Sequence, residues 1–314
     1  MYKPKVSVII PMYNTSEYIE EAIRSIMNQT LSHIEIIVVD DGSTDNSLEI
    51  AKRLQDIDNR ITIYSQENKG QAVARNNGLS HAIGDYIYFM DSDDILHTDA
   101  LRTCFDKCIS EDLDFTFFDA ETFSDDNLSL PISYIRKGII STKTETGLLS
   151  LNNQIDKAVY RIPLWLYFIN RNYLKQLNLD FYVGLKHEDQ IFTAKLFLAA
   201  LRVAYIPEVF FFRRLRPGSI MTGQYTMNSV KDYFAVADNL LSFAHSQNKL
   251  VCKTINKTVR FIFDPAIYMA NILSLKERLS IAKTCMLRYW KYISLKSWLV
   301  LLFPWLIKLK SYTK

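Results

Sequence analysis

Three carboxylates that follow one short apolar stretch are the residues best suited to carry out chemistry. Tyr86–Met90 has the composition of a buried strand. Asp91, Asp93 and Asp94 come directly after it. In an open α/β sheet, ligands bind in the crevice at the carboxyl ends of the strands, where Asp91 and Asp93 would project together. Neighbouring carboxylates repel each other unless a positive charge lies between them, and a hard divalent cation supplies that charge. A cluster that caps the helix predicted from Asp99 is the alternative.

The elements that would position these carboxylates form a repeating strand and helix pattern. Near-continuous apolar runs predict buried parallel strands, and apolar residues at helical spacing predict the helices between them. The earlier strands are Val6–Ile10, which Pro11 would end, Ile34–Val39 and Ile61–Tyr64. Four such steps in about a hundred residues predict a parallel sheet with right-handed crossovers. A second acidic strand end, Asp40–Asp41, occurs in this pattern, which favours a ligand site over helix caps. Neither GxGxxG nor GxxxxGKS/T occurs, so a dinucleotide fingerprint and a P-loop are excluded.

Composition and charge separate the C-terminal region from the rest of the chain. The 314 residues suffice for one large domain or two modest ones. A hydrophobic content of 48%, with 18 Tyr and 18 Phe, excludes a disordered chain. The formal net charge is +3, but Val251–Lys314 contains twelve Lys or Arg and two acidic residues, a net of +10. The preceding residues therefore carry −7, which indicates a different partner for the C-terminal region.

The four cysteines do not form a zinc or disulfide pattern. Cys104 and Cys108 are one helical turn apart, Cys252 and Cys285 are distant, and no CxxC spacing occurs. Spacing of this kind is typical of buried thiols. Residues 1–5 lead directly into the first strand, leaving no room for the apolar region of a signal peptide. We therefore expect a cytoplasmic protein with reduced thiols.

Four motifs occur in order along the first hundred residues: residues 6–14 (VSVIIPMYN), 38–45 (VVDDGSTD), 68–78 (NKG with ARNNG) and 91–94 (DSDD). They resemble the motifs of the family 2 glycosyltransferases, which have a GT-A fold. The resemblance is close over about residues 4–110 and looser to about residue 220. It implies an α/β fold, a GT-A-like Rossmann-related and mostly parallel sheet flanked by helices. It further implies a catalytic domain over residues 1–222. Beyond that domain the resemblance fades, and the helical pattern and positive charge of residues 223–314 predict a helical, basic C-terminal region.

The resemblance also implies which residues bind the nucleotide and the metal. The nucleotide-binding set carried over by position is Pro11, Tyr13, Asp41, Arg75, Asp91 and Ser92. In that family Asp41 would accept from the uracil ring, while Asp91 and Asp93 form the DxD motif that meets the ribose and a Mn²⁺ or Mg²⁺ ion. A departing nucleotide diphosphate develops negative charge, which a bound cation stabilises. Helix capping by Asp41 and a solvated ion pair at Arg75 are the structural alternatives.

Glu188 and Asp189 are the predicted catalytic acids. They open a helix whose apolar positions have core spacing, and acids at a helix start are also ordinary partners of the helix dipole. Their position resembles the ED motif of the family, whose aspartate is the general base of inverting members. A sugar hydroxyl is a poor nucleophile at neutral pH, so a carboxylate within hydrogen-bond reach is needed. The resemblance therefore assigns Asp189 as the base, with Glu188 orienting it or meeting the acceptor.

Arginines after residue 210 are predicted to form a mobile basic loop. Arg213, Arg214 and Arg216 adjoin Pro217–Ser219. The family uses a similar loop to close over the donor diphosphate, which implies roles for Arg214, Arg216 and Ser219. A solvated charge run is the alternative. Upstream of this loop, an aromatic strand is expected at Pro163–Ile169.

The function implied is transfer of a sugar from a UDP-sugar donor to a hydroxyl of a saccharide acceptor, by one in-line displacement with inversion. The setting implied is assembly of a bacterial capsule, O-antigen or other surface polysaccharide, with a hexosyl or N-acetylhexosaminyl group transferred. A polyprenyl-phosphate glycosyltransferase, whose acceptor needs no strong base, and a non-catalytic nucleotide or saccharide binder are the alternatives. No nucleic-acid partner is expected.

The C-terminal region is expected to meet an anionic membrane without crossing it. The apolar segment Trp298–Ile307 has about ten residues, half of the roughly 20 that a spanning helix needs. Lysines flank it on both sides and two tryptophans lie within it, which suits a peripheral segment on the inner face of the cell membrane. Such a location would also suit a lipid-linked saccharide acceptor. A buried helix kinked at Pro304 is the alternative.

Overall fold

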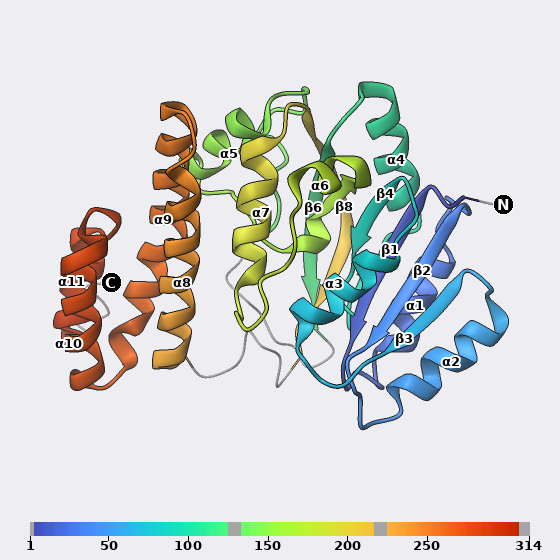
Figure 1. Cartoon of the computed structure of the whole chain (residues 1–314), viewed down its shortest axis with the longest axis horizontal. Coiled ribbons are helices and arrows are strands. Elements are labelled where there is room, and N and C mark those ends of the chain that lie inside the picture. Colours follow the sequence, from blue (N-terminus) through green and yellow to red (C-terminus); the bar gives the residue numbers. More distant parts are fainter. Residues whose placement is uncertain (1–2, 125–132, 217–224, 308–314) are drawn as a thin grey trace. The chain divides into compact units, whose positions relative to one another are not determined.

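The computed structural model describes residues 3–124, 133–216 and 225–307, and these fall into two compact units (Figure 1). The larger unit comprises Met1–Gly184 and Phe192–Pro217, and the smaller unit comprises Leu185–Ile191 and Gly218–Lys314. The domain boundary predicted after residue 222 stays a prediction, because residues 217–224 lie outside the described part of the chain.

The larger unit is built on one mixed sheet with the strand order β3-β2-β1-β4-β7-β6-β8-β5. The strands are β1 (Val6–Met12), β2 (Ile34–Asp40), β3 (Ile61–Ser65), β4 (Tyr86–Phe89), β5 (Ile95–Leu96), β6 (Phe115–Phe123), β7 (Tyr167–Asn170) and β8 (Val203–Arg214). Strands β1 to β4 pair in parallel, as the apolar runs predict. Beyond β4 the sheet becomes mixed, because β7 pairs antiparallel with both β4 and β6, whereas β8 runs parallel to β6.

Strand β1 lies inside the parallel part and extends past the point expected from its proline. All seven of its residues are buried, as a strand covered on both faces requires. Pro11 pairs in register with Val39 of β2, so it does not end the strand. Pairing with β4 ends at Ile9, so Pro11 lies where β1 has a neighbour on one side only. A residue without an N–H is tolerated there.

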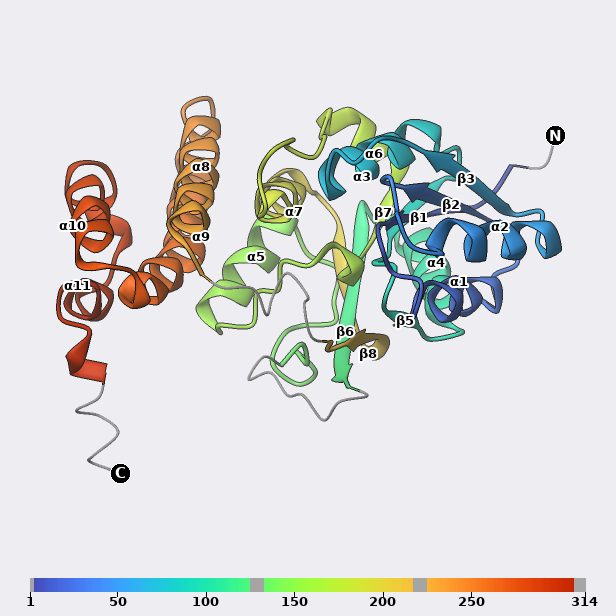
Figure 2. The ribbon, with the colours of Figure 1, turned by 90° about the horizontal axis from the view of Figure 1, so that it is seen from below.

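Helices cover both faces of this sheet. In Figure 2, α3 and α6 lie on one face and α1 and α4 on the other. The helices of the larger unit are α1 (Ile19–Met27), α2 (Ser47–Ile57), α3 (Gln71–His81), α4 (Ala100–Glu111), α5 (Gly147–Asp156), α6 (Arg171–Leu177) and most of α7 (Glu188–Ala199). Helix α1 buries Ile19, Ala22, Ile23 and Ile26, the residues that recur at helical spacing.

Two segments beyond β4 differ from the sequence expectation. The strand predicted over Pro163–Ile169 begins only at Tyr167, because Leu164–Leu166 forms a 3₁₀ turn in which Leu166 N–H donates to Pro163. Arg213 and Arg214 belong to strand β8, and not to a loop as predicted. Their backbone is extended because β8 pairs with β6 as far as the register Phe123 with Arg214.

The smaller unit is helical, as predicted. Its elements are α8 (Met227–Ala244), α9 (Lys249–Met269), η3 (Ala270–Ile272), α10 (Leu275–Thr284), a π-helical turn η4 (Cys285–Tyr289), η5 (Trp290–Tyr292) and α11 (Leu295–Leu302). Helix α9 packs against α8 and α11 and buries nine of its residues. Side-chain caps from Thr226, Asn248 and Ser294 begin α8, α9 and α11.

Candidate active site

Asp91 lies at the carboxyl end of β4 and meets two side chains of α3. Its Oδ1 accepts from Arg75 Nη2 at 3.1 Å and from Gln71 Nε2 at 3.1 Å. Arg75 is buried, and its guanidinium carbon lies 5.5 Å from the centroid of the Phe181 ring. The helix and the strand end therefore come together through one charged contact, and Asp91 keeps 30% of its side chain exposed to solvent.

Asp93 and Asp94 meet arginines from the end of β8. Asp93 Oδ2 accepts from Arg216 Nε at 2.6 Å, and its backbone carbonyl accepts from Arg214 Nε at 3.1 Å. Asp94 is buried and turns away, since its Oδ1 accepts from the backbone N–H of Arg214 at 2.7 Å. Asp94 therefore fixes the strand end, and Asp91 and Asp93 are the two carboxylates of the cluster with partly exposed side chains.

Electrostatics within the cluster favour a positive charge. Burial, and then the nearby charge of Asp91, raise the pKa of Asp93, against the opposing effect of Arg216. Burial and the charges of Asp93 and Asp91 raise the pKa of Asp94 well above its usual range. The carboxylates thus destabilise one another, and a cation between them would relieve that repulsion.

The two arginines that contact this cluster share an aromatic neighbour. Tyr18 lies 5.1 Å from the guanidinium of Arg214 and 5.3 Å from that of Arg216, measured to its ring centroid. Arg214 also pairs with Glu21 of α1. The predicted diphosphate loop is therefore a strand residue, Arg214, followed by Arg216, while Ser219 lies outside the described residues.

Asp41 at the end of β2 is buried and organises the loop before α3. Its carboxylate accepts from Gln66 Nε2 at 2.8 Å and from the backbone N–H groups of Lys69 and Gly70 at 2.9 and 2.8 Å. Gly70 has φ of 90°, a conformation that favours glycine. Asp41 therefore shapes this loop, and its predicted contact with a uracil ring stays a prediction.

The remaining predicted nucleotide residues lie at the same strand ends. Pro11 is buried in β1, Ser92 is buried between the two candidate metal ligands in sequence, and Tyr13 is 47% exposed after β1. An exposed ring beside the carboxyl edge of the parallel strands is available to a planar ligand.

Helix α7 carries the predicted catalytic acids in its first turn. Glu188 is buried and Asp189 is partly exposed. Three residues further on, Phe192 stacks on Phe181 with 4.3 Å between ring centroids and meets Phe89 edge-on at 6.0 Å. Phe89 ends β4, directly before the acidic cluster. These aromatic contacts fix the body of α7 to that strand end.

The first turn of α7 also has contacts within the smaller unit. The ring of His187 lies 4.4 Å from that of Tyr233 on α8, and Tyr233 hydrogen-bonds Gln190. Burial lowers the pKa of His187, although the charge of Asp189 opposes that change. His187 is therefore neutral at pH 7, and it presents no fixed cation beside Asp189.

The acidic cluster suits a divalent cation whose remaining coordination positions are filled by a bound ligand. Among the residues that the structure describes, no group of three or more His, Cys, Asp or Glu side chains could hold a metal ion alone. Asp91 and Asp93 offer two carboxylates with partly exposed side chains. Mg²⁺ commonly takes one or two carboxylates and completes its coordination with substrate phosphates. The donor set therefore suits a cation that arrives with a diphosphate.

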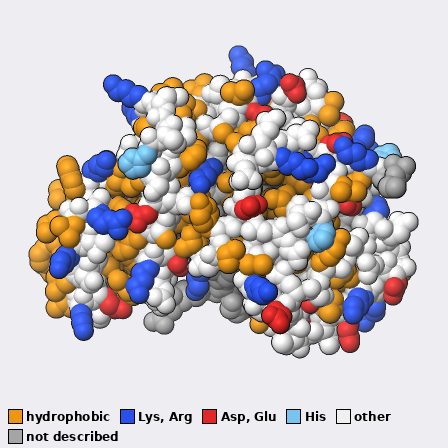
Figure 3. Space-filling model, in the orientation of Figure 1, with side chains coloured by type: hydrophobic (Ala, Val, Ile, Leu, Met, Phe, Trp, Pro, Cys, Tyr) orange, Lys and Arg blue, Asp and Glu red, His pale blue; other side chains and the backbone are white. Residues whose placement is uncertain are grey.

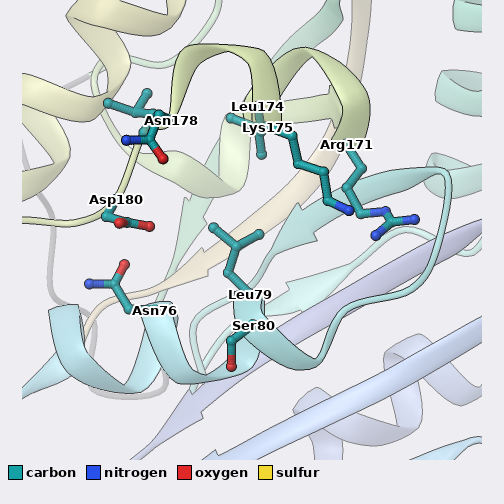
Figure 4. A pocket seen from close by; sticks show the side chains of 9 residues that line it. Asn76, Leu79, Ser80, Arg171, Leu174, Lys175, Asn178 and Asp180 are labelled. Carbon is teal, nitrogen blue, oxygen red and sulfur yellow. The ribbon is translucent and has the colours of Figure 1, made fainter.

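A separate pocket of about 230 Å³ lies between α3 and α6 (Figure 4). Asn76, Leu79 and Ser80 line it from α3, facing Leu174 and Lys175 of α6. None of the predicted site residues is among those that line it. Two hydrogen bonds hold the wall of this pocket in place. Asn76 Nδ2 donates to the backbone carbonyl of Phe181 at 2.9 Å, and the backbone N–H of Phe181 donates to Asn76 Oδ1 at 2.8 Å.

Three residues that organise the site belong to none of the motifs recognised in the sequence: Tyr18, Gln71 and Phe181. Asp94 belongs to the acidic cluster, but its contact with the backbone of Arg214 has no signal in the sequence. A lone polar residue just after the NKG turn was the only available signal for Gln71.

The fold and the site define an α/β protein in which paired acids and arginines lie at the carboxyl ends of parallel strands. The chain belongs to glycosyl transferase family 2, whose sequence profile matches residues 7–164. Glycosyltransferase GlyG of Streptococcus pneumoniae is 30% identical over 246 residues, which cover 76% of this chain and 79% of GlyG. Glycosyltransferase GlyA of the same organism is 32% identical over 69% of this chain, but the match spans only 31% of GlyA.

Solved structures confirm the predicted fold class. Staphylococcus aureus TarS 1–349 in complex with UDP-GlcNAc has a TM-score of 0.66 and 22% identity, covering 88% of this chain and 83% of that one. The mannosyltransferase PcManGT of Pyrobaculum calidifontis, in complex with GDP-Man and Mn²⁺, has a TM-score of 0.58 and 17% identity, covering 96% and 85%. The GT-A-like expectation is therefore confirmed, with a sheet that is mixed beyond β4.

Proposed function

We propose that this glycosyltransferase transfers a hexosyl or N-acetylhexosaminyl group from a UDP-sugar to a hydroxyl of a saccharide acceptor, with inversion. The acceptor oxygen would form a bond to the anomeric carbon while the bond from that carbon to the diphosphate oxygen breaks. UDP leaves with the electron pair, and the proton of the hydroxyl passes to an enzyme carboxylate. The bound UDP-GlcNAc of the similarly folded TarS supports the choice of donor.

The paired acids and arginines at the end of β4 carry this proposal. Asp91 contacts Arg75, and Asp93 contacts Arg216, at 3.1 and 2.6 Å. A nucleotide diphosphate offers oxygens to the guanidinium groups, which form charge-assisted hydrogen bonds with phosphate. With a nucleotide diphosphate bound, the guanidinium groups of Arg75 and Arg216 would contact its phosphate oxygens in place of the two carboxylates.

Asp91 and Asp93 would hold a Mn²⁺ or Mg²⁺ ion together with the diphosphate. All the side-chain donors are oxygen, which suits both ions, and PcManGT was solved with Mn²⁺. The ion would supply charge stabilisation for the leaving UDP. Arg75 and Arg216 would add fixed positive charge on the protein side of the same group.

Asp189 is the proposed general base. Its side chain is partly exposed at the start of α7, and the body of this helix is fixed to β4 through Phe192 and Phe89. A partly exposed carboxylate can accept a proton from an acceptor hydroxyl that reaches it. Glu188 is buried beside it in sequence and would orient the base.

The proposed setting is synthesis of a bacterial surface polysaccharide. The name of one relative refers to such a polymer. It is a putative teichuronic acid biosynthesis glycosyltransferase, TuaG, of Bacillus subtilis, which is 43% identical over 37% of this chain. A lipid-linked saccharide acceptor would be reached by a peripheral enzyme at an anionic membrane surface.

Release of UDP from a panel of UDP-sugars tests the donor, and calorimetry of UDP with and without EDTA tests the metal. We expect one UDP-sugar to be turned over and UDP affinity to fall when the divalent cation is removed. Undiminished UDP affinity in EDTA would exclude the metal role of Asp91 and Asp93. Turnover of GDP-sugars alone would exclude the UDP donor.

A further inference from the structure

The smaller unit exposes apolar side chains that its own packing does not need. Besides Leu287, which is 70% exposed, four large apolar residues from α10 to η5 are between 53% and 66% exposed: Leu275, Leu279, Met286 and Trp290. They follow one another by four, seven and four residues, which places them on about the same side of consecutive helical turns. Ile281 and Cys285 face the interior instead and are fully buried. This segment therefore carries two apolar sides, one buried and one exposed.

Helix α11 repeats this arrangement next to α10. Leu295, Leu299 and Phe303 follow one another by four residues and are between 41% and 75% exposed, whereas Val300 and Leu301 are buried. Helices α10 and α11 pack against each other. We call these seven exposed residues of α10, η4, η5 and α11, including Phe303 directly after α11, the α10–α11 surface. Hydrophobic side chains interspersed with Lys and Arg are visible on the part of Figure 3 where these helices lie.

The charges of the segment that carries this surface are almost all positive, although Arg288 is paired with Asp238 of α8 at 2.8 Å. Residues 270–307 contain six Lys or Arg and a single acid, Glu277. Glu277 is engaged in the capping box of α10, where it accepts from the backbone N–H of Ser274 at 3.0 Å. The exposed lysines of the same stretch are Lys276, Lys283, Lys291 and Lys296. Positive charge therefore accompanies the exposed apolar stripes along both helices.

We infer that the α10–α11 surface binds the interface of an anionic lipid bilayer. Apolar stripes flanked by lysines, with an exposed tryptophan, are the features by which amphipathic helices lie at the boundary of headgroups and acyl chains. Among the described residues, no helix is both long and apolar enough to cross a membrane. Each lysine near an anionic surface contributes about 1 kcal/mol, and the apolar residues add the free energy of their burial.

The positive charges also favour a lipid bilayer over a second copy of this chain as the partner of this surface. In a two-fold contact the surface would face itself, which would bring Lys276, Lys283, Lys291 and Lys296 close to the same lysines of the other copy. Like charges brought together at an interface are repulsive. Phosphate groups of acidic lipids complement these lysines instead.

The apolar segment Trp298–Ile307, where the sequence predicts the membrane contact, supplies part of this surface. Val300 and Leu301 are buried within the smaller unit, whereas Leu299 and Phe303 are exposed. The exposed residues begin at Leu275, more than twenty positions earlier. Membrane binding by this surface is measured without turnover, so its test is independent of the proposed reaction.

Vesicle flotation of the whole chain tests the inference. The protein is mixed with vesicles of phosphatidylcholine alone or with about 30 mol% phosphatidylglycerol, whose negative surface potential attracts basic segments. The test variant is Leu279→Glu with Met286→Glu, and the matched control is Leu250→Glu with Leu201→Glu. The control residues are 61% and 75% exposed and lie outside the α10–α11 surface. All four positions are on the surface, so circular dichroism should be unchanged.

We expect the unchanged chain and the control to float with acidic vesicles, and the test variant to lose at least about tenfold in partitioning. Changing one exposed lysine, Lys283→Gln, should reduce partitioning about fivefold, which corresponds to about 1 kcal/mol. Equal flotation of test and control variants would overturn the inference. So would a test variant that floats normally but loses a concentration-dependent dimer, since the occupant would then be a second copy. Binding to neutral vesicles as strong as to acidic ones would remove the role of the lysines.

Discussion

Phe181 connects three elements of the site, which makes it a sensitive point for mutation. Its ring stacks on Phe192 of α7 at 4.3 Å, meets Phe89 of β4 edge-on at 5.2 Å and lies under the guanidinium of Arg75 at 5.5 Å. Only 2% of the residue is exposed. Phe181→Ala would therefore open a cavity between the helix that carries the proposed base and the strand that carries the acids.

The expected loss follows from these contacts. Burial of a Phe side chain contributes about 1.5–3 kcal/mol, and each aromatic pair adds about 0.5–1.5 kcal/mol. These contributions agree with the range of about 3–5 kcal/mol found for Phe→Ala in protein cores. We expect a loss of that size in the free energy of unfolding. UDP affinity should fall roughly 2–30-fold, because Arg75 loses a cation–π contact worth about 0.5–2 kcal/mol.

Urea denaturation and calorimetry of UDP would measure the two effects. The matched control is Tyr182→Ala, which removes an aromatic ring at the next position, where the residue is 39% exposed. It should cost less than about 1 kcal/mol. A loss below about 1 kcal/mol for Phe181→Ala, or equal losses for the two variants, would refute the view that Phe181 holds these elements together.

Three further changes test other parts of the structure. Asp189→Asn should keep UDP affinity and lower turnover roughly 10²–10⁴-fold in steady-state assays; a fully active variant would remove this residue from the mechanism. Arg136→Met should cost about 3–5 kcal/mol in urea denaturation, because the fully buried carboxylate of Asp119 would lose its ion-pair partner, and adding Asp119→Asn should recover part of that loss. Gly78→Ala should cost about 1–3 kcal/mol by overpacking, since the added Cβ would lie 2.4 Å from Ile9 Cγ2; an unchanged melting temperature would contradict that packing.

The parallel half of the larger unit could be predicted from local pattern. Strands β1, β2 and β4 are near-continuous apolar runs, and a strand buried on both faces needs such a run. The acidic ends of β2 and β4 are recognisable because carboxylates follow the apolar residues directly. The cluster around Asp91 and Asp93 was therefore visible before any three-dimensional information.

Pairings between distant residues could not be predicted in this way. Strand β8 contains Pro207 and two arginines, and it is extended because it adds to β6, which is about 90 residues earlier in the chain. The contact of Asp94 with the backbone of Arg214 spans 120 residues. Local spacing carries no information about such partners, so Asp94 could not be separated from Asp91 and Asp93, whose side chains are partly exposed.

The distribution of tryptophan has a spectroscopic consequence. The chain has four tryptophans, at positions 165, 290, 298 and 305. Trp165 of the larger unit is buried and stacks on Phe211 at 4.2 Å, whereas Trp290 and Trp305 of the smaller unit are 66% and 58% exposed. Indole emission shifts to longer wavelength in contact with water and to shorter wavelength in an apolar environment. The intrinsic fluorescence of the unlabelled protein therefore reports mainly on the surroundings of α10 and α11, and Trp290→Phe would remove the signal of a single position on that surface.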